Sequence, residues 1–165
     1  MSRFIHLAHL KDPSFVKAGA YITRGQQIGF IGNTGAAYNG SHLHIECTKS
    51  KPLTWTVYPT GLSIRRVKEL YDDPSFLFKD GIPCDFTYKG YGWLQWTGTV
   101  FHPAIDANSP NDFGKPVFSP VNGRVQFSEG VSAWNKWGRK LLPSFYNKGF
   151  GNHVWIEVDE ANSGI

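Results

Sequence analysis

The sequence predicts a mostly β fold that carries one short helix. Its 165 residues include 18 glycines and 10 prolines, and 15% of them are aromatic, which is typical of short strands joined by tight turns. With 41% hydrophobic and 18% charged residues, the chain is predicted to be globular rather than disordered. This length favours a single domain with a core of its own.

The first third of the chain is predicted to form strands interrupted by glycines. Residues 4–10 and 43–47 have the pattern of strands. Residues 28–32 are typical of a buried strand, and residues 33–35 of the turn that ends it. Residues 16–29 carry a glycine about every six positions, so we expect short strands there.

The middle of the chain holds the predicted helix. Residues 49–63 are rich in Lys, Pro, Thr and Gly, and we expect them to run over the surface. Residues 63–71 then place Ile64, Val67 and Tyr71 on one helical face.

A second β-rich block begins near Val100. Residues 114–127 are predicted to form a hairpin around Asn122 and Gly123, because an Asn-Gly pair suits a two-residue turn between strands. Residues 153–158 are the last predicted strand.

The net charge of the chain does not identify a single class of binding partner. A net charge of +4 favours an anionic partner such as a cell-wall polymer, a nucleic acid or a membrane surface. Scattered basic residues fit an ordinary solvated surface equally well. The sequence has no aromatic-basic RNA-binding motif and no basic helix, so no nucleic-acid partner is predicted.

The sequence predicts neither membrane insertion nor a signal peptide. No stretch approaches the length of an apolar membrane span, and the first residues lack the apolar run of a signal peptide. Cys47 and Cys84 are the only cysteines. They can pair or both remain buried thiols, and neither lies in a Cys-x-x-Cys motif.

Two segments carry groups that bind metal ions. His42 and His44 alternate with one residue between them, so in a strand they project to one face. His102 and Asp106, four apart, share a face in a strand or in a helix. Two histidines and one aspartate leave a fourth position on zinc for water, and zinc lowers the pKa of that water to about 7. A spare histidine nearby can act as general base, so the pattern predicts a hydrolytic site.

The surrounding sequence makes these motifs far more specific than they are alone. The segments concerned are Leu7–Leu10, Val16–Gly19, Gly25–Gly35 and Gly40–Glu46 early in the chain, and His102–Asp106, Gly114–Val125 and Gly149–Ile156 late in it. By the order and spacing of its glycines, the early set resembles the C-terminal half of the LytM/lysostaphin-like zinc endopeptidases, peptidase family M23. The late set resembles the N-terminal half of the same domain.

The resemblance implies a role for five residues. His102, Asp106 and His44 would bind zinc (Zn2+). His42 matches the catalytic histidine of the family. His9 matches a second active-site histidine, which positions water or stabilises the tetrahedral intermediate.

The remaining histidines are expected to be bystanders. His6 would lie on the opposite face from His9 if their strand is regular, and His153 would lie on an outer face. Ala104 stands where the family often has glycine. Some members place an oxyanion-stabilising tyrosine shortly before the first zinc histidine. Here Trp93 and Trp96 stand in that neighbourhood, with Tyr91 farther back, so no oxyanion residue is assigned.

The two halves stand in the reverse of the family's order. The sequence therefore predicts one circularly permuted domain over residues 1–165. Residues 1–48 form the family's C-terminal half, 49–98 a connecting segment, and 99–165 the N-terminal half. The alternatives are a fragment of a tandem array and halves exchanged between two molecules, which would give a strand-exchanged dimer.

The resemblance implies two antiparallel β sheets around a groove, of barrel-sandwich type, with zinc on its floor. The aromatic stretch 86–97 and the loop 128–148 are candidate groove walls, with core packing as the alternative for their tryptophans. The expected activity is hydrolysis of peptide bonds in bacterial peptidoglycan, outside the cell or at the cell wall, with delivery by a phage or as part of a larger exported protein. The alternatives are a non-catalytic regulatory or phage-tail domain that binds cell wall, and a carbohydrate-binding or phosphocarrier-like module.

Overall fold

The structure is a computed structural model that describes residues 2–35, 40–55, 60–129, 150–163 and 165. Antiparallel pairing arranges the described strands into two sheets of unequal size. The smaller sheet pairs β3 (Gln27–Phe30) with β8 (Pro116–Phe118). Across the larger sheet the order is β2 (Tyr21–Ile22), β9 (Gly123–Glu129), β10 (Asn152–Val158), β1 (Phe4–Leu10), β4 (Leu43–Thr48), β7 (Ala104–Asn108) and β6 (Tyr88–Lys89), with β5 (Tyr71–Asp72) paired to β4.

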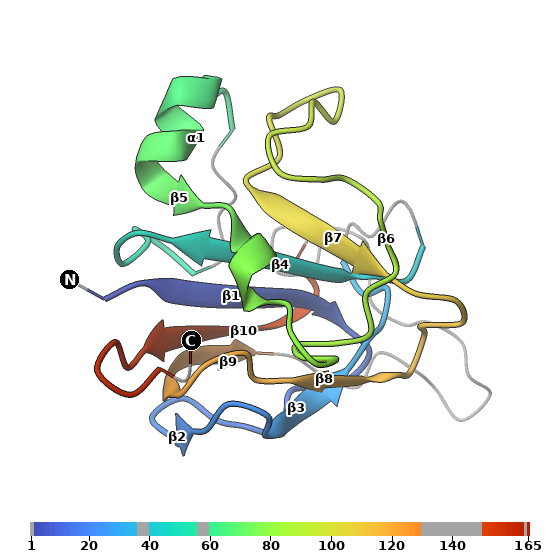
Figure 1. The fold of residues 1–165 in the computed structure, drawn as a ribbon, viewed down its shortest axis with the longest axis vertical. Helices are drawn as coiled ribbons and strands as arrows, with labels where there is room; N and C mark the ends of the chain where they lie inside the picture. Colours follow the sequence, from blue (N-terminus) through green and yellow to red (C-terminus); the bar gives the residue numbers. More distant parts are fainter. Residues whose placement is uncertain (1, 36–39, 56–59, 130–149, 164) are drawn as a thin grey trace.

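This architecture confirms the predicted mostly β fold with antiparallel sheets and one α-helix among the described residues. The helix, α1 (Ile64–Leu70), begins at Ser63, whose side chain accepts a hydrogen bond from the backbone N–H of Arg66. Of the three residues predicted to share a helical face, Val67 and Tyr71 are buried, whereas Ile64 is exposed. A 3-10 turn, η1 (Pro74–Leu77), follows β5. Figure 1 shows α1 at one end of the molecule and the β3–β8 pair at the other.

No helix in the described ranges has both the length and the apolar character that a membrane crossing requires. The two cysteines, Cys47 and Cys84, are buried free thiols, so they do not form the disulfide that the sequence left open. Burial raises the pKa of each thiol to about 12.

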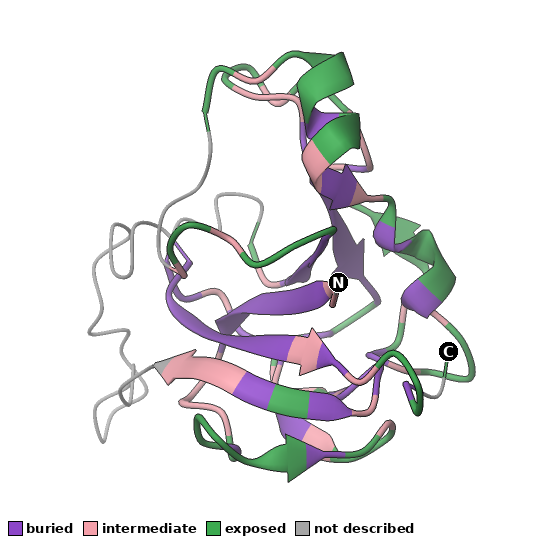
Figure 2. Ribbon diagram, turned by 90° about the vertical axis from the view of Figure 1, so that its left-hand side faces the viewer, coloured by how far each residue is buried: buried purple, intermediate pink, exposed green. Residues whose placement is uncertain are grey.

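The register of the large sheet separates an apolar face from a polar and aromatic one. Residues that pair across neighbouring strands point to the same face. On one face Leu7 pairs with Ile45 and with Val154, and Ile45 pairs with Ile105. These side chains belong to the apolar core, and Figure 2 shows how completely the central strands are buried.

The opposite face carries the chemistry-bearing side chains. His6 pairs with Glu46 and with Trp155, Ala8 pairs with His44, and His44 pairs with Asp106. All of these residues are buried. The large sheet therefore presents its histidines and carboxylates together, with the apolar core behind them.

The hairpin predicted around Asn122 and Gly123 is wrong. β8 pairs with β3 in the small sheet, whereas β9 begins at Gly123 and pairs with β10 and β2 in the large one. The chain crosses from one sheet to the other through Ser119 and Pro120, and proline cannot donate a hydrogen bond to a continuing ladder.

Gly32 packs closely against the backbone at the end of β1. It also bonds to His42, the predicted catalytic histidine. Its carbonyl accepts a hydrogen bond from the N–H of His42, and a Cβ atom at Gly32 would lie 2.4 Å from the Lys11 backbone. We expect Gly32→Ala to lower the free energy of unfolding by about 1–3 kcal/mol, because the backbone must shift. Urea denaturation measures this change.

Gly29→Ala is the matched control. A Cβ atom there would meet only the Leu10 side chain, at 3.4 Å. A smaller loss is expected from this substitution, and equal losses from the two variants would contradict the proposed close approach.

Candidate metal centre

Two adjacent strands bring the separated metal-binding motifs together. β4 and β7 are antiparallel neighbours, and their register sets His44 directly opposite Asp106, 62 positions away in the chain. His42 stands just before β4, and His102 just before β7. The two strand starts lie at opposite ends of this antiparallel pair, yet the side chains of His42 and His102 both approach Asp106.

Three of these side chains form a compact ligand set. The Nδ1 atom of His44 lies 3.0 Å from Oδ1 of Asp106, and Nε2 of His102 lies 3.4 Å from the same oxygen. One ligand atom from each residue lies within 4.8 Å of the others, and all three residues are buried. Ligands about 2.0–2.2 Å from a tetrahedral zinc ion lie about 3.3 Å from one another, so the donor types and spacing fit zinc.

Outer contacts select the ligand nitrogen of each histidine. The Nε2 atom of His44 lies 2.7 Å from a Glu46 carboxylate oxygen, which orients Nδ1 toward Asp106. The Nδ1 atom of His102 lies 3.1 Å from the Gly92 carbonyl, which leaves Nε2 as its ligand atom. Such second contacts fix the tautomer and ring orientation of metal-binding histidines.

The electrostatics of the set also suit a cation. Burial would raise the pKa of Asp106, but its hydrogen bonds to His102 and His44 hold that pKa well below its ordinary value. Burial likewise opposes protonation of His44, yet Asp106 and Glu46 together raise its pKa to about 10. The proton on His44 between these carboxylates occupies the place that a metal ion would take.

The predicted catalytic histidines flank the ligand set. The Nε2 atom of His42 lies 3.6 Å from Oδ1 of Asp106, and Nδ1 contacts the Gly40 carbonyl at 3.0 Å. The Nδ1 atom of His9 contacts the Thr34 carbonyl at 2.7 Å. The His9 and His42 rings are 5.0 Å apart. The structure thus brings together all five residues predicted for the site, whose roles stay predictions.

Burial keeps both flanking histidines neutral. It lowers the pKa of His42, against the opposing charge of Asp106. It lowers the pKa of His9 well below its ordinary value, and the neighbouring imidazoles of His42 and His44 oppose protonation further. In a neutral ring whose Nδ1–H donates to a carbonyl, Nε2 is an acceptor, so each residue can take a proton at Nε2.

Local backbone geometry fixes these two side chains. His9 has a positive φ of 62° at an irregularity between Leu7 and Leu10, and its N–H donates to the Phe150 carbonyl. The segment before His42 is tied down by Ser41, whose hydroxyl donates to the buried carboxylate of Asp112. Neither contact is visible in the sequence.

The bulge at His9 also corrects the predicted place of His6. The two were expected on opposite faces of a regular strand, but the irregularity puts both beside His44. The His6 and His9 rings lie 6.2 and 5.7 Å from the His44 ring. His153, predicted on an outer face, is fully buried, and its Nδ1 atom lies 2.6 Å from Nε2 of His6.

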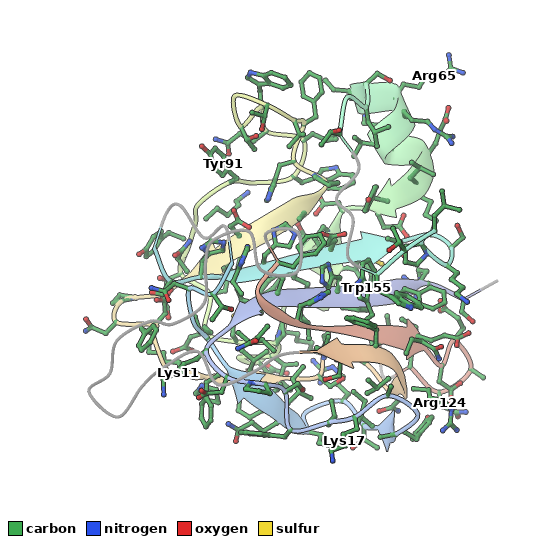
Figure 3. All side chains as sticks on the ribbon, turned by 180° about the vertical axis from the view of Figure 1, so that it is seen from behind. Lys11, Lys17, Arg65, Tyr91, Arg124 and Trp155 are labelled. Carbon is green, nitrogen blue, oxygen red and sulfur yellow. The ribbon has the colours of Figure 1, made fainter. Side chains whose placement is uncertain are left out.

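Tyr91 is a neighbour of the centre that the sequence did not assign. The chain folds back on itself between residues 91 and 103, because Leu94 donates to the His102 carbonyl and His102 donates to that of Gln95. This brings the Tyr91 ring to 5.9 Å from the His102 ring. Figure 3 shows Tyr91 on the loop that leads into β7. The fold-back brings Tyr91 close to His102 although it stands farther back in sequence than the family pattern suggests.

The candidate groove walls have mixed outcomes. Within 86–97, Trp93 packs partly against the core, whereas Trp96 is exposed and its ring lies 4.9 Å from that of Phe101. Most of the loop 128–148 lies outside the described residues.

Comparison with known proteins gives one positive result. The model for peptidase family M23 matches residues 1–55. This segment contains His9, His42 and His44 but not His102 or Asp106. The comparisons with curated proteins and with solved structures gave no match. The match supports an M23 relationship for the first third of the chain, and the His44–His102–Asp106 set agrees with the metallopeptidase chemistry of that family.

We expect the candidate centre to bind one zinc ion. His102→Ala should weaken zinc binding more than 100-fold, because loss of a ligand exceeds the roughly 10–100-fold cost of an altered outer contact. His9→Gln is the matched control and should stay within a few-fold of the parent. Competition with a chromophoric chelator measures both. Equal affinities for His102→Ala and His9→Gln would contradict the ligand set.

Zinc binding should release a proton from His44. With a pKa of about 10, the metal-free ring is protonated at pH 8, and a ligand nitrogen must be deprotonated. Zinc affinity is therefore expected to fall as pH is lowered. Calorimetric titration at pH 8 in buffers of different ionisation enthalpy should show a release of about one proton from this residue. Zinc uptake without proton release would show that His44 is neutral or does not bind.

Proposed function

We propose that this domain is a zinc-dependent endopeptidase that hydrolyses peptide bonds in bacterial peptidoglycan. The observation that carries the proposal is the buried set of His44, His102 and Asp106 with His42 and His9 beside it. Three protein ligands with an open fourth position are typical of catalytic rather than structural zinc. The M23 match over residues 1–55 supports the same chemistry.

Each residue has a role that its contacts support. Zinc supplies Lewis acidity and lowers the pKa of water to about 7. His42, with a neutral ring near Asp106, accepts the proton of the attacking water at Nε2. His9, whose Nδ1 atom contacts the Thr34 carbonyl, accepts a hydrogen bond from the water at Nε2 and so positions it. Tyr91, whose ring lies 5.9 Å from that of His102, is a candidate to contact the substrate.

We also propose that the two halves are circularly permuted. In the large sheet β10 and β1 are antiparallel neighbours, with Phe4 opposite Glu157. Arg3 forms a double hydrogen bond with Glu160 beyond that pair. A chain in the family's order would join these strands as a hairpin.

The substrate proposal extends to where the protein acts. Peptidoglycan lies outside the cytoplasmic membrane, so we place the activity at the cell wall, delivered by a phage or within a larger exported protein. The net charge of +4 suits association with anionic wall polymers.

The test is release of new amino groups from purified peptidoglycan by the zinc-loaded protein. We expect His42→Ala to lower the rate by about 10²–10⁴-fold, because a general acid–base contributes that much, while it retains zinc. Sequencing the new termini would name the bond that is cut. One bound zinc with no release from several wall types, but with wall binding retained, would support a non-catalytic domain instead.

A further inference from the structure

A line of buried side chains leads from the metal centre into the large sheet. It begins at His44, whose Nε2 atom lies 2.7 Å from Glu46. The same Glu46 oxygen lies 3.3 Å from Nδ1 of His6, and Nε2 of His6 lies 2.6 Å from Nδ1 of His153. The members come from three adjacent strands, β4, β1 and β10, and they share the polar face.

Aromatic packing holds the middle of this line rigidly. The His6 ring lies flat on Trp155, with centroids 4.1 Å apart and planes 5° from parallel. The Phe150 ring meets it edge-on at 4.4 Å. Figure 3 shows Trp155 over the central strands of the sheet. Because His6 and His153 are fully buried, neither ring can turn without repacking its neighbours.

These nitrogens are costly if their only task is to fill the core. The contact between His6 and Glu46 is not aligned as a hydrogen bond, and Nε2 of His153 is buried without a partner among the described residues. A buried unsatisfied polar atom costs about 1–3 kcal/mol. Phenylalanine would fill the same aromatic stack without that cost, so stability alone does not account for the two imidazoles.

The contacts along this line indicate where its protons lie. The Glu46 carboxylate oxygen lies between the imidazoles of His44 and His6, and a carboxylate oxygen accepts hydrogen bonds. Glu46 therefore only accepts, which places N–H groups on Nε2 of His44 and Nδ1 of His6. Burial keeps His6 and His153 neutral by lowering their pKa values. Nε2 of His6 must then accept from Nδ1–H of His153.

We propose that His6 and His153 are positioning residues of the metal centre. They hold the Glu46 carboxylate in place, and Glu46 in turn fixes the ring orientation of His44 and presents its Nδ1 atom to the metal. Without His6, Glu46 would keep a single imidazole partner and its carboxylate could rotate. This inference rests on the proposed zinc site but concerns residues outside its ligand set.

Substitutions at His6 separate positioning from packing. His6→Phe keeps a planar ring on Trp155 but removes both nitrogens, whereas His6→Asn keeps an N–H near the position of Nδ1. We expect His6→Phe to weaken zinc binding about 10–100-fold and His6→Asn to stay within about threefold of the parent, as for other outer-shell contacts. Zinc affinity is measured by chelator competition well below the unfolding temperature of each variant.

His153 offers a second, milder variant with its own control. His153→Phe leaves the contact between His6 and Glu46 but removes the group that holds His6, so we expect a loss of about 3–10-fold. Phe127→Leu is the control, because the Phe127 ring packs 5.2 Å from that of His153 and donates no hydrogen bond. Its zinc affinity should match the parent's.

Cobalt substitution gives a readout that packing alone would not change. The visible absorption bands of Co2+ report ligand geometry, so they should shift in His6→Phe and His153→Phe but not in Phe127→Leu.

Parent-like affinity and spectra in folded His6→Phe would overturn the inference, and so would equal losses in His6→Phe and His6→Asn. If His6→Phe does not fold, the zinc affinity and cobalt spectrum of His153→Phe are compared with the parent's instead, and parent-like values would overturn the inference. A parent protein that binds no zinc would instead overturn the metal centre, and this inference with it.

Discussion

The antiparallel register between β4 and β7 is the constraint on which the candidate site depends. It sets His44 opposite Asp106 and Ile45 opposite Ile105. One face of the strand pair therefore carries the candidate metal ligands, and the other face packs into the apolar core. A slip of one residue would turn His44 into the core and expose the isoleucine pair. The apolar contacts behind the sheet therefore select the register that assembles the ligand set, and folding and chemistry depend on the same strand pair.

The same register buries charged side chains, and the cost of removing them from water is offset because they pair with one another. Asp106 and Glu46 are both buried carboxylates, and His44 lies between them with a contact to each. A buried ion pair that loses one partner is strongly destabilising, because the other charge stays desolvated. A divalent cation bound by Asp106 would supply positive charge at this place when His44 gives up its proton. The metal-free and metal-bound centres can thus both be close to neutral in charge.

Much of this arrangement could be predicted from residue types and spacing, and the failures have specific causes. Alternation predicted that His42 and His44 share a face, but only the family resemblance linked them to His102 and Asp106, since long-range pairing leaves no local signal. His6 was misplaced because the irregularity of β1 near His9 has no sequence marker.

Other misses arose from tertiary packing. His153 was assigned to an outer face because alternation cannot distinguish a half-buried strand from one covered on both faces, as β10 is. Local turn chemistry predicted a hairpin at Asn122, but the pairing of β8 with β3 overrode it. Tyr91 stands too far from His102 in the sequence for their proximity to be predicted. The chain folds back between them and brings the two rings together.

The proposed reversal of the two halves is physically inexpensive, because the sheet depends on strand neighbours rather than on chain order. The contacts of β1 with β10 and of β4 with β7 do not require the connections that the family uses.

What the reversed order needs is a segment from the end of β4 to the start of β7. Here that segment adds β5 to β4 and β6 to β7, so it is anchored to the sheet at both ends. The entropy of closing a long connection grows only slowly with its length, and these anchors divide it into shorter loops. The reversed chain can therefore keep the strand register that assembles the centre.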